Sequence, residues 1–82
     1  MNINKQYAMT DIQLDCKNLN CPMPIVKIAK AFRQLEVAQT LEVTATDPAF
    51  RADVEAWTRR TGNELLEFRD SPEEKVAVLK KV

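Results

Sequence analysis

The chain of 82 residues contains no histidine and only one glycine, Gly62. Without histidine it cannot form a Cys-His nucleophile pair, nor a zinc site with a histidine ligand. A single glycine cannot supply the glycine-rich loop that binds phosphates in nucleotide-binding proteins. These absences exclude most enzyme classes, and we expect neither a metal nor a cofactor.

An excess of one charge and long apolar runs are also missing. Twelve basic and twelve acidic side chains give a net charge of zero, so nothing favours direct binding to nucleic acid. No apolar run approaches the roughly 18 residues of a membrane span, and no signal-peptide pattern opens the sequence. Two cysteines are too few for the disulfide framework of a small secreted domain. We therefore expect a cytoplasmic protein without a membrane or nucleic-acid partner.

What is present is a series of short periodic segments that predicts one small domain. Residues 1–10 are expected to form a loose tail, and residues 11–82 the domain. Polar and apolar residues alternate in the predicted strands and follow helical spacing in the predicted helices. In order, these are strand 11–16, helix 22–36, strand 41–46, helix 48–61, strand 64–69 and strand 75–81.

The connections between these segments define the expected fold. A helix joins the first two strands, which predicts that they run parallel with a right-handed crossover. The strands other than the last have one polar face, so both helices are expected to cover the same face of the sheet. The sequence predicts a βαβαββ two-layer α/β sandwich, with two helices on one face of a mixed four-stranded sheet.

The second helix has local signals at both ends. Asp47 is expected to be its N-cap and Pro48 its first residue, and capping accounts for both without a functional role. Phe50, Val54 and Trp57 fall at helical spacing and are predicted to form its buried stripe. The chain's one glycine follows the last turn, where a left-handed residue commonly ends a helix.

One turn and one strand carry more specific expectations. Asn18 is predicted to adopt a left-handed conformation after the first strand. In the third strand, Leu66 and Phe68 are predicted to face the core, whereas the side of Leu65 is left open.

Cys21 stands directly before two prolines, Pro22 and Pro24, where a loop meets the first helix. Proline suits the first turn of a helix, because the backbone N–H there has no intrahelical partner. The thiol is therefore expected at the positive end of the helix dipole, which stabilises a thiolate. Lys17 and Lys27 are expected to add favourable potential. A buried, inert cysteine is the alternative, but a position outside the strand pattern favours an exposed, reactive thiol.

Cys16 shares the inward parity of Ile12 and Leu14 in the first strand, which predicts a structural role. Four residues separate it from Cys21, so a disulfide between the two would close a short loop if the geometry allowed. A thiol-disulfide redox protein using these two cysteines stays open as an alternative function.

The first helix also has a basic face formed by Lys27, Lys30 and Arg33. Such a face is usually only solvated, but it lies on the helix that follows Cys21 and would suit an acidic partner. This face, or the exposed sheet face, leaves a second alternative open, a non-catalytic protein-interaction or regulatory domain.

The residues around Cys21 resemble a known family. Leu14-Asp15 followed by Leu19-Asn20-Cys21-Pro22-Met23-Pro24 is similar to the L-D…L-x-C-P-x-P signature of the TusA/SirA-type sulfur-carrier family. The similarity covers about residues 11–69 and continues through segments 41–43, 47–48 and 61–66, with Asp53 and Trp57.

The resemblance implies a sulfur carrier, a persulfide sulfurtransferase-type protein that acts with partner enzymes in the same βαβαββ fold. Cys21 would accept sulfane sulfur as a persulfide and relay it. The implied donor is a cysteine desulfurase or a rhodanese-like protein, and the acceptor is a protein with a reactive cysteine. The family serves tRNA 2-thiolation or sulfur-trafficking and sulfur-oxidation pathways. With no histidine in the chain, activation of Cys21 would rest on the helix N-terminus and nearby lysines.

The chain departs from the family pattern at two turns where members often have glycine. Asn18 tolerates a left-handed conformation at a modest cost. Gln39 leaves the conformation of the turn before the second strand open.

Overall fold

The computed structural model describes residues 10–82, so Thr10 is the one residue of the expected tail within the described range. Six elements follow in the predicted order, with boundaries within two residues of those expected from the periodicity. They are β1 (Ile12–Cys16), α1 (Met23–Gln34), β2 (Thr40–Ala45), α2 (Phe50–Thr61), β3 (Glu64–Asp70) and β4 (Lys75–Lys80).

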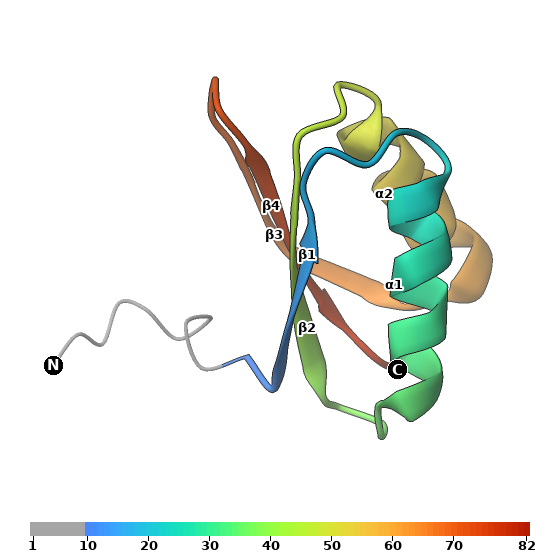
Figure 1. The fold of residues 1–82 in the computed structure, drawn as a ribbon. Helices are drawn as coiled ribbons and strands as arrows, with labels where there is room; N and C mark the ends of the chain where they lie inside the picture. Colours follow the sequence, from blue (N-terminus) through green and yellow to red (C-terminus); the bar gives the residue numbers. More distant parts are fainter. Residues whose placement is uncertain (1–9) are drawn as a thin grey trace, which may run out of the picture.

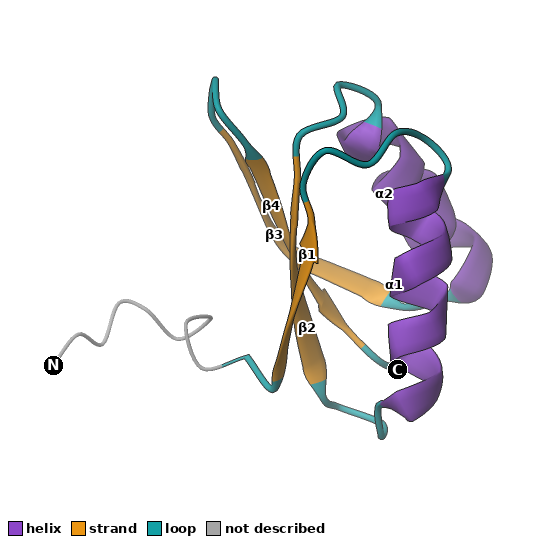
Figure 2. Ribbon diagram, viewed as in Figure 1, coloured by secondary structure: helices purple, strands orange, loops and turns teal. Residues whose placement is uncertain are grey.

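The four strands form one mixed sheet in the order β1-β2-β4-β3. β1 and β2 are parallel, as the connecting helix predicted, and β4 pairs antiparallel with both β2 and β3. Figures 1 and 2 show both helices on the same side of this sheet. The predicted two-layer sandwich is therefore confirmed. Neither helix within residues 10–82 combines the length and apolar character needed to cross a membrane.

The core fills the space between the sheet and the helices. Leu41, Val43 and Ala45 on β2 are fully buried, as their alternation predicted. Phe32 of α1 and Trp57 of α2 meet edge to face, with ring centroids 4.9 Å apart. This contact packs the C-terminal halves of the two helices against each other.

The inward side chains of β3 differ from the expectation. A β-bulge between Leu65 and Glu67 interrupts the pairing with β4. Because a bulge inserts an extra residue, it changes the parity of the strand. Leu65 and Phe68 consequently pack against the core, whereas Leu66 does not. The prediction for Phe68 is confirmed and the one for Leu66 is wrong.

The face of the sheet opposite the helices is covered by charged side chains. Arg69 on β3 reaches across β4 to Glu42 on β2 (3.1 Å) and also pairs with Glu67 on its own strand (3.3 Å). Val78 on β4 pairs in register with both glutamates and is fully buried. The ion pairs therefore cover Val78 of β4 on the face of the sheet that carries no helix.

α1 begins and ends slightly inside its predicted bounds. Pro22 is its N-cap rather than its first residue, and the helix ends at Gln34 with Leu35 as C-cap. The ammonium group of Lys81 donates to the carbonyl oxygens of Phe32 (2.8 Å) and Leu35 (2.7 Å). The ammonium group thus caps the last turn of the helix, where carbonyl groups lack their usual partners, although the Phe32 carbonyl also accepts the Leu35 N–H (3.2 Å).

α2 begins later than expected. Its N-cap is Ala49, so the assignment of Asp47 as N-cap and Pro48 as first residue is wrong. Asp47 instead forms a turn ahead of the helix, with its Oδ1 accepting a hydrogen bond from the Ala49 N–H (3.2 Å). At the other end, Gly62 has a φ of 79° and ends the helix in the left-handed conformation, as predicted.

Two non-glycine residues adopt a left-handed conformation within the described part of the chain. Asn18 has a φ of 67°, as predicted, and Ala38 has a φ of 78°. In the turn before β2, whose conformation the sequence left open, the left-handed residue is therefore Ala38 and not Gln39. The Gln39 side chain stabilises this turn, since its Oε1 accepts a hydrogen bond from the Glu36 N–H (2.8 Å).

Candidate functional site

Cys21 lies in the loop between β1 and α1 and carries an exposed, free thiol. β1 and β2 are parallel neighbours, so the loops that follow them meet at one end of the sheet (Figure 1). The backbone N–H of Asn18 donates to Thr46 Oγ1 (2.9 Å). The backbone N–H of Cys21 donates to Asp47 Oδ2 (2.7 Å). These hydrogen bonds tie the two loops together at Cys21.

Asp47 joins the Cys21 loop to the start of α2, because one carboxylate oxygen contacts each segment. From the sequence alone, capping accounts for Asp47 and the contact with Cys21 is not visible. The two residues are 26 positions apart, and the parallel pairing of β1 with β2 brings them together. The order of the predicted strands was the signal that could have indicated this contact.

Asp53, in the first turn of α2, completes the group of polar side chains around the sulfur. Cys21 Sγ and one carboxylate oxygen from each of Asp47 and Asp53 lie within 4.8 Å of one another. The hydrogen bond to the Asp53 carboxylate raises the pKa of Cys21, and desolvation and the charges of Asp53 and Asp47 raise this pKa further. The site favours the protonated thiol, where the sequence predicted a stabilised thiolate.

The start of α1 explains why the helix does not stabilise a thiolate as expected. Pro22 and Pro24 have no N–H group. The N–H of Met23 donates to a carbonyl in the preceding turn (2.8 Å), and the N–H of Ile25 donates to the Pro22 carbonyl (3.1 Å). The first turn therefore leaves no unpaired N–H for the sulfur of Cys21. The absence of two of these donors was visible in the sequence.

The two lysines expected to support the sulfur act elsewhere. Burial raises the pKa of Cys16, and the charge of Lys27 partly offsets that effect. Lys17 lies at the edge of the open sheet face, with its backbone N–H donating to Asp15 Oδ1 (2.9 Å). The charges that shift the pKa of Cys21 are those of carboxylates, so the surroundings of its sulfur are acidic rather than basic.

Cys16 is fully buried in the core and is a free thiol, as its inward parity predicted. Desolvation is the main cause that raises its pKa. A buried thiol with a raised pKa is a poor nucleophile and a poor leaving group in disulfide exchange. The geometry therefore gives no support to a redox pair of Cys16 and Cys21.

The group formed by Cys21, Asp47 and Asp53 offers one sulfur and two carboxylate oxygens as donors. A structural zinc site uses four ligands, mostly cysteine and histidine. The Asp47 oxygens already accept hydrogen bonds from backbone N–H groups. We therefore assign no metal to this group.

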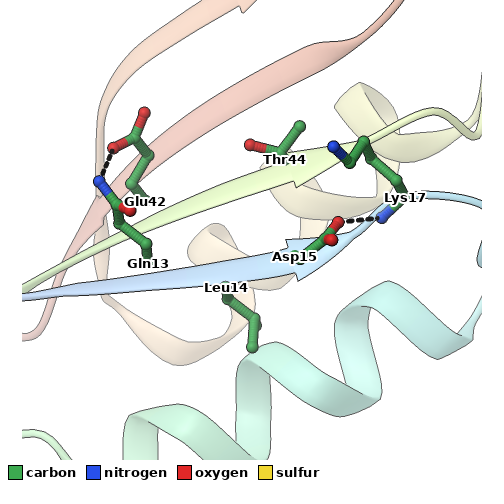
Figure 3. Close-up of a pocket in the computed structure, with 6 residues that line it drawn as sticks. All are labelled: Gln13, Leu14, Asp15, Lys17, Glu42 and Thr44. Carbon is green, nitrogen blue, oxygen red and sulfur yellow. Dashed lines mark hydrogen bonds between the residues drawn. The ribbon is translucent and has the colours of Figure 1, made fainter.

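A shallow hollow of about 370 Å³ lies along β1 and β2, apart from Cys21 (Figure 3). Its lining is mostly polar and consists of Gln13, Leu14, Asp15, Lys17, Glu42 and Thr44. The Gln13 side chain donates to Glu42 Oε1 (3.3 Å) across the two strands, while Leu14 points toward α1 in the figure. The hollow lacks the apolar walls of a typical small-molecule site, and we assign no ligand to it.

The exposed face of α1 begins immediately after Cys21. Met23 and Val26 are 45% and 42% exposed. Lys27, Lys30 and Arg33 continue the same exposed stripe at helical spacing. Within residues 10–82, none of these three basic side chains forms an ion pair. We call Met23, Val26, Lys27, Lys30 and Arg33 the α1 stripe.

Comparison with known proteins shows one family to which nearly all of the described chain is similar. The sequence model of the family described as "Sulfurtransferase TusA" matches residues 12–81. A Bacillus subtilis protein named "Putative sulfur carrier protein YrkI" is 49% identical over 61 residues, which cover 74% of this chain and 81% of that protein. The "Sulfur carrier protein TusA" of Allochromatium vinosum is 42% identical over 60 residues, which cover 73% of this chain and 79% of that protein.

A further relative shows the same similarity within a larger protein. The "Putative sulfur carrier protein YrkF" of Bacillus subtilis is 51% identical over 55 residues. The match covers 67% of this chain but 30% of that protein. The similarity therefore concerns one part of that relative.

Proposed function

The chain belongs to the TusA family, in which the matched relatives are named sulfur carrier proteins, and we propose that Cys21 is the thiol that carries the sulfur. The observation that supports this best is that Cys21 is exposed whereas Cys16, the other cysteine of the chain, is buried. A sulfur atom bound to Cys21 is accessible to the active sites of other proteins.

The proposed reaction is a relay of one sulfur atom in two exchange steps. In the first, the deprotonated Cys21 attacks the outer sulfur of a donor persulfide. A new S–S bond forms on Cys21, the S–S bond of the donor breaks, and the donor sulfur leaves as a thiolate that takes up a proton. In the second, an acceptor thiolate attacks the outer sulfur and releases the Cys21 thiolate. The carrier returns to its starting form without net oxidation or reduction.

The proposed donor is a cysteine desulfurase or a rhodanese-like protein, and the proposed acceptor is a protein with a reactive cysteine. Both follow from the family resemblance, as does a role in tRNA 2-thiolation or sulfur oxidation. We place the reaction in the cytoplasm, where reducing conditions keep exposed cysteines as thiols. The net charge of zero supports protein partners over direct contact with nucleic acid.

The α1 stripe supports docking of such partners beside Cys21. Met23 and Val26 provide apolar contact area next to the thiol. Lys27, Lys30 and Arg33 complement an acidic rim on a partner, since they form no ion pair with a described residue. In the free protein the stripe remains in contact with water.

The experiment that tests the proposal is mass spectrometry after incubation with a cysteine desulfurase and cysteine. We expect the mass of the chain to increase by one sulfur atom, and peptide mapping to place that atom on Cys21. The variant Cys21→Ala should stay unlabelled, while Cys16→Ala should label like the parent. Labelling of Cys21→Ala to the same extent as the parent would contradict the proposal.

The same variants address the alternative functions. A non-catalytic interaction domain requires that Cys21→Ala retain full function in cells together with partner binding. A redox pair requires that oxidation produce a disulfide between Cys16 and Cys21, a reaction that the burial of Cys16 opposes.

A further inference from the structure

The Asp53 carboxylate has no competing partner near Cys21. Among residues 10–82, this carboxylate forms no ion pair, and one of its oxygens lies within 4.8 Å of the Cys21 sulfur. The nearest basic residue on the same helix, Arg51, is occupied elsewhere. Its guanidinium pairs with Glu55 (3.2 Å) and lies over the Phe68 ring, 5.0 Å from the centroid. Within the described part of the chain, no ion pair therefore neutralises the charge of Asp53 beside the sulfur.

Each of the segments around Cys21 carries at least one charged side chain. Lys17 belongs to its own loop, Lys27 to α1, Asp47 to the loop before α2, and Asp53 to α2. The two aspartates are the charged groups that raise the pKa of the Cys21 thiol. Asp47 is held by two backbone N–H groups (2.7 and 3.2 Å), which leaves Asp53 as the acceptor for the thiol proton.

Asp53 also stands at the end of its helix that suits a carboxylate. It lies in the first turn of α2, where the helix dipole stabilises negative charge. The start of α1 offers no compensating donor, because its N–H groups are either absent at proline or bound to carbonyl oxygens. The α2 helix therefore directs a negative group at the sulfur, while the α1 helix directs no N–H at it.

From this arrangement we propose that Asp53 is a positioning residue that holds the Cys21 sulfur as an oriented, protonated thiol in the free protein. The inference deepens the sulfur-carrier proposal and rests on it for its biological meaning, because it names the residue that restrains the carrier thiol before a partner binds. The thiol S–H donates to the carboxylate, and removal of the carboxylate charge makes the thiolate easier to form. No bond other than this hydrogen bond is involved.

The test is the pH dependence of alkylation of Cys21 by iodoacetamide in the full chain, followed by mass spectrometry of the Cys21 peptide. We expect Asp53→Asn to move the midpoint of the rate profile to lower pH. A midpoint that is lower by about one pH unit raises the thiolate fraction at neutral pH about tenfold. Because nucleophilicity falls with basicity, the rate constant at neutral pH should rise only about three- to fourfold for the same change in midpoint.

Two variants on the same helix separate this effect from a general one. Glu55→Gln removes one negative charge that pairs with Arg51 rather than with the sulfur, and it should leave the midpoint unchanged. Asp53→Glu keeps the charge and should keep the midpoint close to that of the parent. Circular dichroism of each variant checks that the fold is retained.

The proposal is overturned if Asp53→Asn has the same midpoint as the parent, a higher one, or one shared with Glu55→Gln. No sulfur donor is present in this assay. Its outcome therefore stands even if Cys21 fails to accept sulfur from a desulfurase, and the two proposals can fail independently.

Discussion

Replacement of Ala38 by glycine should stabilise the protein. Ala38 adopts a φ of 78° in the turn before β2, and a residue with a Cβ in this region costs roughly 1–2 kcal/mol. Glycine removes that cost but increases the entropy of the unfolded chain, which lowers the gain by about 0.4–1 kcal/mol. The residue is exposed and its N–H bonds the Lys81 carbonyl (2.8 Å), a contact that the substitution retains. The net stabilisation expected for Ala38→Gly is about 0.5–1 kcal/mol.

Urea denaturation followed by the fluorescence of Trp57 is a suitable assay, since this single tryptophan is 5% exposed in the folded protein. The midpoint should rise with an unchanged slope, and the melting temperature should rise by about 2–8 °C. The matched control is Ala52→Gly, an exposed position in α2. There the same substitution should destabilise by about 0.5–1 kcal/mol. A loss of stability in Ala38→Gly, or equal effects at both positions, would refute the reasoning.

Three further predictions concern the site. Lys30→Glu reverses a charge of the α1 stripe and should raise the KM for a sulfur donor severalfold with little change in kcat. The control Arg60→Glu, on α2, should leave this KM unchanged. Steady-state labelling measures KM and kcat for each variant. Asp47→Asn weakens the hydrogen bonds that tie the Cys21 loop to α2 and should cost about 1 kcal/mol in urea denaturation. Burial raises the pKa of Cys16 above its ordinary value of 9.0, so the folded chain binds more protons than the unfolded chain above that pH. Stability should therefore fall with rising pH there, by at most about 1.4 kcal/mol per pH unit, and fall less in Cys16→Ala.

The spacing of the apolar residues was sufficient to predict the order of the elements, because it has a period of two in strands and of about 3.6 in helices. The prediction failed in β3, where a regular alternation would make Leu66 face the core. The bulge between Leu65 and Glu67 is a property of the pairing with β4, and the residues of β3 by themselves do not indicate it. The sequence left the turn before β2 open, because it does not show that Ala38 takes the left-handed conformation while the side chain of the neighbouring glutamine caps the turn.

The candidate site was predicted in part. The prolines indicated where Cys21 lies, and parity indicated that Cys16 is buried. The surroundings of the sulfur could not be derived in the same way, because Asp47 and Asp53 follow a different strand and reach Cys21 through the parallel pairing of β1 and β2. The expected stabilisation of a thiolate had a more elementary flaw. A helix start with two prolines has few N–H groups to offer, and the remaining ones are bound to carbonyl oxygens.

The carboxylates beside Cys21 also affect how the exposed thiol withstands oxidants. Peroxide and low-molecular-weight disulfides react with the thiolate, and oxidation beyond sulfenic acid is generally irreversible. A thiol with a raised pKa presents little thiolate to these small molecules at neutral pH. An exposed cysteine with acidic neighbours is therefore spared much of the oxidative damage that the same cysteine would suffer beside unpaired lysines.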